Sequence, residues 1–134
     1  MKYISTRDNS VEYSFEQVFI KGLADDGGLF VPKKVKKYNA EEIKAFSELN
    51  YQDLAKKIIH PFLSDFMTVS ELSNIVDKSY SVFRKDNTVD LIKVGDIKIL
   101  ELFHGPTLAF KDIAMQLLRN FYEFHLKKND QKIN

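Results

Sequence analysis

The sequence has 134 residues, of which 44% are hydrophobic and 29% charged, as is typical of one soluble globular domain. A formal net charge of +1 argues against nucleic-acid or membrane-surface binding driven by bulk charge. The chain has no cysteine, no apolar run near the roughly 20 residues that span a bilayer and no secretory signal. We therefore expect a cytoplasmic protein without disulfides.

Two short strands and a helix are predicted within the first 32 residues. Residues 2–5 and 29–31 are short apolar runs bounded by turn-forming residues. Between them, Ser14 and Gln17 form a capping-box sequence, in which each side chain bonds the backbone N–H of the other residue. The helix that starts there is expected to end at Gly22, because glycine weakens helices.

Three further short amphipathic helices follow, predicted over residues 39–49, from Asn50 to Pro61, and over residues 68–80. Ile43 and Phe46 are expected to face inward on the first of them. Pro61 is expected to stop or kink the second. These helices carry no group that suggests chemistry.

A basic run, Lys33-Lys34-Val35-Lys36-Lys37, separates the second predicted strand from these helices. Clusters of this kind occur in nuclear-import signals. A solvated loop is the better interpretation in a chain so close to neutral.

A hairpin and a long helix are predicted for the last third of the chain. Residues 91–94 and 97–100 flank Gly95-Asp96, which suits a type II′ turn. The second strand should stop at Gly105-Pro106, and the helix should begin at Thr107 as its N-cap. We divide the chain into a mostly helical domain over residues 1–83 and the start of a second domain over residues 84–134.

Lys111 has an unusual position in the first turns of that predicted helix. At about 100° per residue, it falls on an apolar arc with Phe110, Ala114, Met115, Leu118, Phe121 and Tyr122. The opposite stripe is polar, with Asp112, Gln116, Arg119, Asn120, Glu123 and Lys127. Either the Lys111 stem covers apolar surface while its ammonium reaches water, or burial and the helix N-terminus favour a neutral, reactive amine. Periodicity alone leaves both open.

Three sequence blocks decide the question by resemblance. Glu101-Leu102-Phe103-His104-Gly105-Pro106-Thr107-Leu108-Ala109-Phe110-Lys111-Asp112 resembles the lysine segment of threonine synthases. Gly22-Leu23-Ala24-Asp25-Asp26-Gly27-Gly28-Leu29-Phe30-Val31-Pro32 and Tyr3-Ile4-Ser5-Thr6-Arg7 resemble the N-terminal signature of the same family. The resemblance runs from Tyr3 to about Leu118, in the family's order, although family members are much longer.

The resemblance implies an α/β fold of the type II pyridoxal-phosphate class, here only its N-terminal part: short helices, a few short strands, a hairpin and the lysine helix. It implies that Lys111 carries pyridoxal 5′-phosphate as a Schiff base, and that O-phospho-L-homoserine and water give L-threonine and phosphate. Phe110 would flank the cofactor. His104 lies in the loop before the helix, where it either contacts cofactor or substrate or shapes the turn.

The phosphate site and the partner of the cofactor ring nitrogen are not visible in the sequence. We therefore expect an incomplete, inactive chain that self-associates through uncovered apolar surface. The alternatives are a related phospho-lyase acting on an amino acid phosphate, or a non-catalytic helical interaction module. No metal site is expected, because the histidines at 60, 104 and 125 are scattered and no HExxH pattern occurs.

Overall fold

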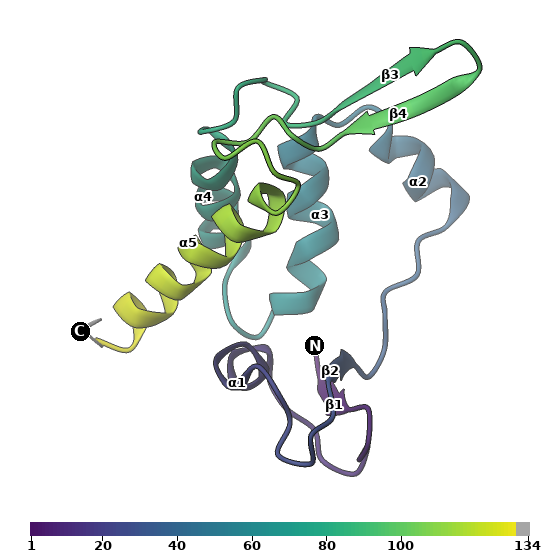
Figure 1. The fold of residues 1–134 in the computed structure, drawn as a ribbon. Coiled ribbons are helices and arrows are strands. Elements are labelled where there is room, and N and C mark those ends of the chain that lie inside the picture. Colours follow the sequence, from purple (N-terminus) through teal and green to yellow (C-terminus); the bar gives the residue numbers. More distant parts are fainter. Residues whose placement is uncertain (131–134) are drawn as a thin grey trace. The chain divides into compact units, whose positions relative to one another are not determined.

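The computed structural model describes residues 1–130 and has short helices, two small sheets and one longer C-terminal helix (Figure 1). In chain order the elements are β1 (Tyr3–Ser5), α1 (Phe15–Lys21), β2 (Phe30–Pro32), α2 (Ala40–Phe46), α3 (Tyr51–Leu63), α4 (Val69–Tyr80), β3 (Asp90–Val94), β4 (Ile97–Glu101) and α5 (Asp112–Lys128). This mixture of elements is the predicted one. The division into domains at residue 83 stays a prediction.

Contacts group the chain into two compact units, which are described separately. Unit 1 consists of residues 1–48 and 56–72, and unit 2 of residues 49–55 and those from 73 onward. No helix in the described part of the chain is both long and apolar enough to cross a membrane.

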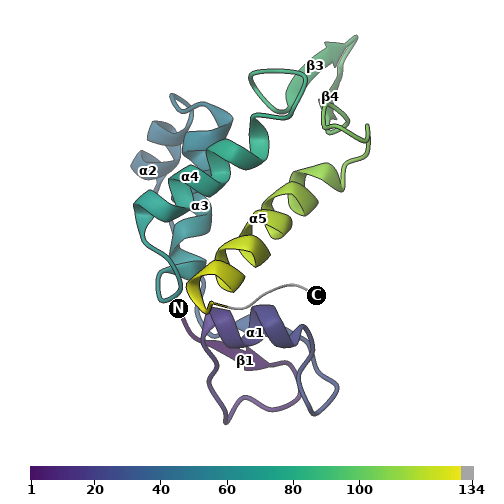
Figure 2. The ribbon, with the colours of Figure 1, turned by 90° about the vertical axis from the view of Figure 1, so that its left-hand side faces the viewer.

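Unit 1 is built on a two-stranded antiparallel sheet with α1 beside it (Figures 1 and 2). In β1 and β2, Tyr3 pairs with Pro32 and Ser5 with Phe30. The Tyr3 ring packs 6.1 Å from that of Phe15, and its hydroxyl donates to the Phe62 carbonyl at 2.8 Å. Burial, reinforced by the nearby Asp65 carboxylate, raises the pKa of Tyr3 to about 12.

Capping residues and a glycine in the sequence predict where the helices of unit 1 begin and end. Ser14 and Gln17 form the predicted capping box, and α1 ends at Gly22, whose φ is +75°. Asn39 and Glu42 form a second box at α2, which ends at Phe46 rather than Leu49. The expected inward position of Ile43 is wrong: its side chain is 59% exposed, so α2 makes little core.

The sequence predicts that Pro61 either stops or kinks α3. Pro61 does not stop the helix. The helix continues to Leu63, with Pro61 in its last turn. A proline at 61 leaves the Lys57 carbonyl without its usual i+4 donor. The Tyr38 hydroxyl lies 3.3 Å from that carbonyl and donates to it, so a residue outside the helix replaces the missing N–H.

Unit 2 combines the end of α4, the β3–β4 hairpin and α5. Tyr80 is central to its core: the ring lies 5.1 Å from that of Tyr51 and 5.4 Å from that of Phe83, and its hydroxyl donates to the Ile113 carbonyl at 3.1 Å. The hairpin has the predicted two-residue turn, with Gly95 at φ +60°, and projects away from α4 and α5 (Figure 1).

Polar contacts join α5 to α4 in this unit. Glu123 accepts from Lys127 at 2.8 Å and from Lys78 at 2.7 Å, and these two partners lower its pKa from 4.5 to about 2. The buried Asn120 amide donates to Ser79 Oγ at 2.8 Å, and Ser79 Oγ donates to the Ile75 carbonyl at 2.7 Å.

Candidate functional site

Lys111 occupies the N-cap position of α5, not its first turns. The helix begins at Asp112, and Lys111 has φ −59° and ψ −26° without a side-chain cap. The predicted N-cap at Thr107 is wrong, because residues 105–111 form consecutive turns instead. The Leu108 N–H donates to the Gly105 carbonyl at 3.2 Å, and Leu108 has a φ of +62° that a helix would not allow.

The carboxylate of Asp112 holds this loop closed. It accepts the Thr107 N–H at 2.8 Å and the Thr107 hydroxyl at 2.9 Å, and the side chain is buried. Burial alone would raise the pKa of Asp112, but the bonds from Thr107, with further ones from Ala109 and Gln116, outweigh it and hold the pKa below its usual value. The loop before Lys111 is therefore fastened by the residue after it.

Gly105 makes this closure possible. A Cβ at that position would lie 2.4 Å from the Asp112 Cβ and 2.7 Å from its Cγ. The backbone at Gly105 thus rests directly on the aspartate side chain. Only a residue without a side chain fits there.

The buried side of α5 does not coincide with the predicted apolar arc. Asp112 and Asn120, predicted on the polar stripe, are buried together with Leu117 and with Phe121 of the apolar arc. Phe110, Met115 and Tyr122, predicted on the apolar arc, are 66%, 55% and 45% exposed. Asp112 and Asn120 are hydrogen-bonded within unit 2, so two polar residues share the buried side of the helix with two apolar ones.

Lys111 lies on the exposed apolar face and is itself exposed. The burial that one of its two interpretations from the sequence required is therefore not seen. A hollow of about 520 Å³ adjoins it, lined by Leu102, Phe110, Lys111, Ile113, Ala114 and Met115. The exposed Lys111 side chain thus lies beside a hollow with a mainly apolar lining.

His104 is buried and hydrogen-bonded through both its ring and its backbone. Its Nε2 lies 2.8 Å from a carboxylate oxygen of Glu101, and its carbonyl accepts the Arg84 N–H at 2.9 Å. These contacts match the turn-shaping alternative. A contact of His104 with cofactor or substrate stays a prediction.

Sequence reasoning missed one grouping around His104. Asp90, Glu101 and His104 each offer one atom that could bind a metal ion, and these atoms all lie within 4.8 Å of one another. The hairpin register, which pairs Asp90 with Glu101, brings them together, and only a prediction of that register could have shown it. Lys85 forms an ion pair with Asp90, and Glu101 bonds His104, so each of the two carboxylates already has a partner.

Residues 2–80 match a family described as "Threonine synthase N terminus". The chain belongs to the threonine synthase family. It is 40% identical to threonine synthase of Pseudomonas aeruginosa and 41% identical to that of Schizosaccharomyces pombe, over 99% and 98% of its own length. A crystal structure of PLP-bound threonine synthase from Brucella melitensis superposes with a TM-score of 0.93 over 98% of the chain, at 36% identity.

The match covers only part of these threonine synthases. The chain spans 29% of the Pseudomonas protein, 26% of the Schizosaccharomyces protein and 29% of the Brucella chain. The predicted fold class, the N-terminal part of the threonine synthase fold, is confirmed by these structural matches.

Proposed function

We propose that Lys111 is the residue that holds pyridoxal phosphate in a threonine synthase reaction, in which O-phospho-L-homoserine and water give L-threonine and phosphate. The observation that carries the proposal is the accessible Lys111 amine at the start of α5, beside an apolar hollow of about 520 Å³. Membership of the family and the PLP-bound Brucella relative support the same cofactor and reaction class.

The residues around Lys111 fit the cofactor in part. Its amine would be the covalent attachment point and, when released, the acid and base that moves protons on the substrate. Phe110, which is 66% exposed beside it, would cover one face of the cofactor ring. The bound cofactor supplies the electron sink that makes elimination of phosphate possible.

The loop that Asp112 holds closed positions the backbone of Lys111. Because Asp112 fastens Thr107 and supports Gly105, the backbone leading to Lys111 is set before any ligand arrives. Donors for the cofactor phosphate and a partner for its ring nitrogen are not assigned among residues 1–130. We therefore propose that the 134-residue chain alone does not make threonine.

Reductive trapping tests the lysine assignment. The chain is incubated with pyridoxal phosphate, reduced with borohydride and mapped by mass spectrometry. Label concentrated on Lys111 is expected, because the hollow beside it accepts the ring, and Lys111→Ala should remove that label without changing the circular-dichroism spectrum. Lys98→Ala, on the exposed hairpin, is the matched control and should leave the pattern unchanged. Equal labelling of all exposed lysines would refute the assignment.

The exposed face of α5 and its loop also supports self-association. Phe103, Leu108, Phe110 and Met115 are each at least half exposed, and the hairpin adds Leu91 and Ile97. We propose that copies of this chain associate through this apolar surface. Light scattering should report a mass above the 15.6 kDa of one chain, and Phe110→Ser with Met115→Ser should lower it. A monomer at every concentration would contradict the proposal.

A further inference from the structure

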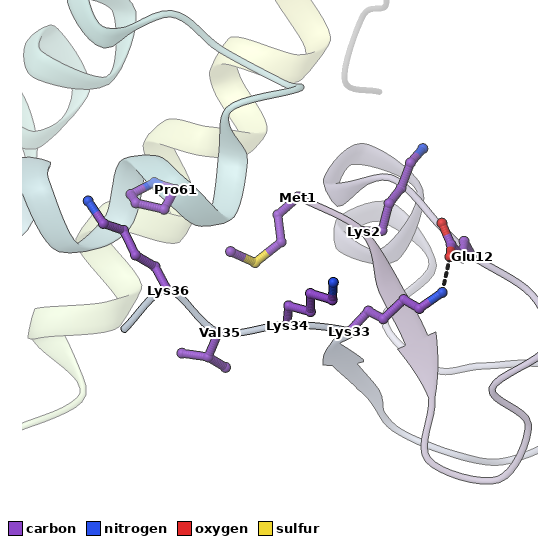
Figure 3. A pocket seen from close by; sticks show the side chains of 8 residues that line it. All are labelled: Met1, Lys2, Glu12, Lys33, Lys34, Val35, Lys36 and Pro61. Carbon is purple, nitrogen blue, oxygen red and sulfur yellow. Dashed lines mark hydrogen bonds and ion pairs between the residues drawn. The ribbon is translucent and has the colours of Figure 1, made fainter. Parts of the chain in front are cut away.

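The basic run after β2 lines a hollow in unit 1 but does not form a site there. The run is exposed, as predicted, and its lysines diverge (Figure 3). Lys2 and Lys36 point to opposite sides of the hollow, and Lys33 is paired with Glu12. A charged surface becomes a binding site only where its groups meet, and these do not.

A second group of titratable side chains, in unit 2, does converge. Asp90 is the first residue of β3, Glu101 is the last residue of β4, and His104 lies in the loop that follows. One oxygen or nitrogen atom from each of the three lies within 4.8 Å of the other two. Their side chains are mostly buried, with exposed fractions of 25% for Asp90, 17% for Glu101 and 11% for His104. Three possible metal ligands thus meet in a partly buried place at the base of the hairpin.

The register of the hairpin places two like charges opposite each other. Asp90 and Glu101 pair directly across the two strands, where carboxylates repel. Lys85 provides one positive charge at this place. Its ion pair with Asp90, together with the charge of Glu101, raises the pKa of Lys85 above its usual value. When His104 is neutral, the two carboxylates and one ammonium leave a net negative charge.

The possible ligands are held in place, whereas the lysine between them and water is not. His104 is fixed by the 2.8 Å contact of its Nε2 with Glu101 and by the bond of its carbonyl to the Arg84 N–H. Lys85 is 47% exposed and has a flexible stem, so its ammonium can turn into water when a stronger cation arrives. The three ligands are therefore preorganised around a replaceable charge.

A buried hydroxyl close by in the chain also lacks a partner. Thr88, two residues before Asp90, is fully buried, and its Oγ1 has no hydrogen-bond partner within residues 1–130. Buried hydroxyls that the protein itself leaves unpaired are usually bonded to a water molecule or an ion. The segment that leads to Asp90 thus has an unused hydrogen-bonding group.

We propose that Asp90, Glu101 and His104 bind a zinc ion, which displaces Lys85. Two carboxylates and one imidazole are ligands that Zn²⁺ accepts, and they leave its fourth position to a water molecule. The imidazole favours zinc over calcium, which takes oxygen ligands alone. The bound ion ties the base of the hairpin to the loop that leads to Lys111. The site is therefore structural, and it does not depend on the proposed reaction.

Calorimetric titration of the full 134-residue chain with zinc chloride near neutral pH tests the proposal. Saturable binding of one ion is expected. His104→Gln should weaken it at least about tenfold, because the nitrogen ligand is lost. Lys85→Gln should tighten it about threefold or more, because the competing cation is removed, and a misfolded variant could not produce such a gain. His60→Gln removes an imidazole from α3, outside the group, and should have no effect.

Nitrogen NMR of the histidine rings locates the ion independently of affinity. Zinc should shift the ring-nitrogen signals of His104 and leave those of His60 and His125 unchanged. The proposal is overturned if binding does not saturate at one ion, if His60→Gln weakens it as much as His104→Gln, or if the His104 signals do not move. It is also overturned if Lys85→Gln does not tighten binding. Calcium binding as tight as zinc binding would overturn it as well, in favour of a site made by the carboxylates alone.

Discussion

Replacing Gly105 with alanine should destabilise the loop that leads to Lys111. The added Cβ would lie 2.4 Å from the Asp112 Cβ, whereas ordinary contacts of this kind begin near 3.4 Å. One of the two backbones must therefore move by about 1 Å (3.4 − 2.4). Because Asp112 is the first residue of α5 and its carboxylate holds Thr107, such a movement also pulls on the bonds that close the loop.

The loss in the free energy of unfolding depends on how easily the two colliding Cβ atoms can move apart. Overpacking typically costs about 1–3 kcal/mol, and less when the end of a flexible side chain can turn away. Here both Cβ atoms are attached directly to backbone, so we expect about 2–3 kcal/mol. Gly105 does not have a positive φ, so none of this cost comes from backbone conformation.

Urea unfolding of the 134-residue chain, followed by circular dichroism, measures this loss. Gly95→Ala is the control: a Cβ there meets nothing within 4 Å, and only its φ of +60° opposes substitution, at roughly 1 kcal/mol. We expect Gly105→Ala to cost at least about 1 kcal/mol more than Gly95→Ala. Equal losses in the two variants would refute the steric argument.

Three further substitutions test other contacts. Gly28→Ala should destabilise unit 1 more than Gly22→Ala does in urea unfolding, because its Cβ would lie 2.2 Å from the buried Ser5 Oγ. Tyr3→Phe should cost about 0.5–1.5 kcal/mol by the same measurement, since it leaves the Phe62 carbonyl without its donor. The folded-state pKa of Glu123, about 2 against 4.5, means that its stabilisation is complete above pH 4.5 and is lost as the pH falls toward 2; Glu123→Gln should flatten that acid loss.

Features that depend on neighbouring residues were predictable from the sequence. The capping boxes at Ser14, Asn39 and Thr68 are all present, because each needs only a partner three residues away. The hairpin at Gly95 follows from an equally local turn preference. The loop at Gly28 shows the limit: its glycine is required by contact with Ser5, not by a positive φ, and that contact depends on strand pairing.

Features that depend on distant partners were missed for a physical reason. A proline at 61 predicts a helix end, and only the fold brings the Tyr38 hydroxyl to the carbonyl that it leaves free. A threonine at 107 predicts an N-cap, and its hydroxyl instead bonds a carboxylate five residues later. In both cases a side-chain hydrogen bond outweighs a local backbone preference.

The buried side of α5 shows the same dependence on distant partners. Hydrophobic periodicity assumes that a helix buries its apolar face, and that assumption fails where polar side chains can be satisfied internally. Asp112 and Asn120 are satisfied in this way and are buried together with Leu117 and Phe121, while Phe110, Lys111 and Met115 are exposed. If Lys111 holds the cofactor as proposed, its amine has to remain accessible, and the exposed residues beside it are available to form a binding surface.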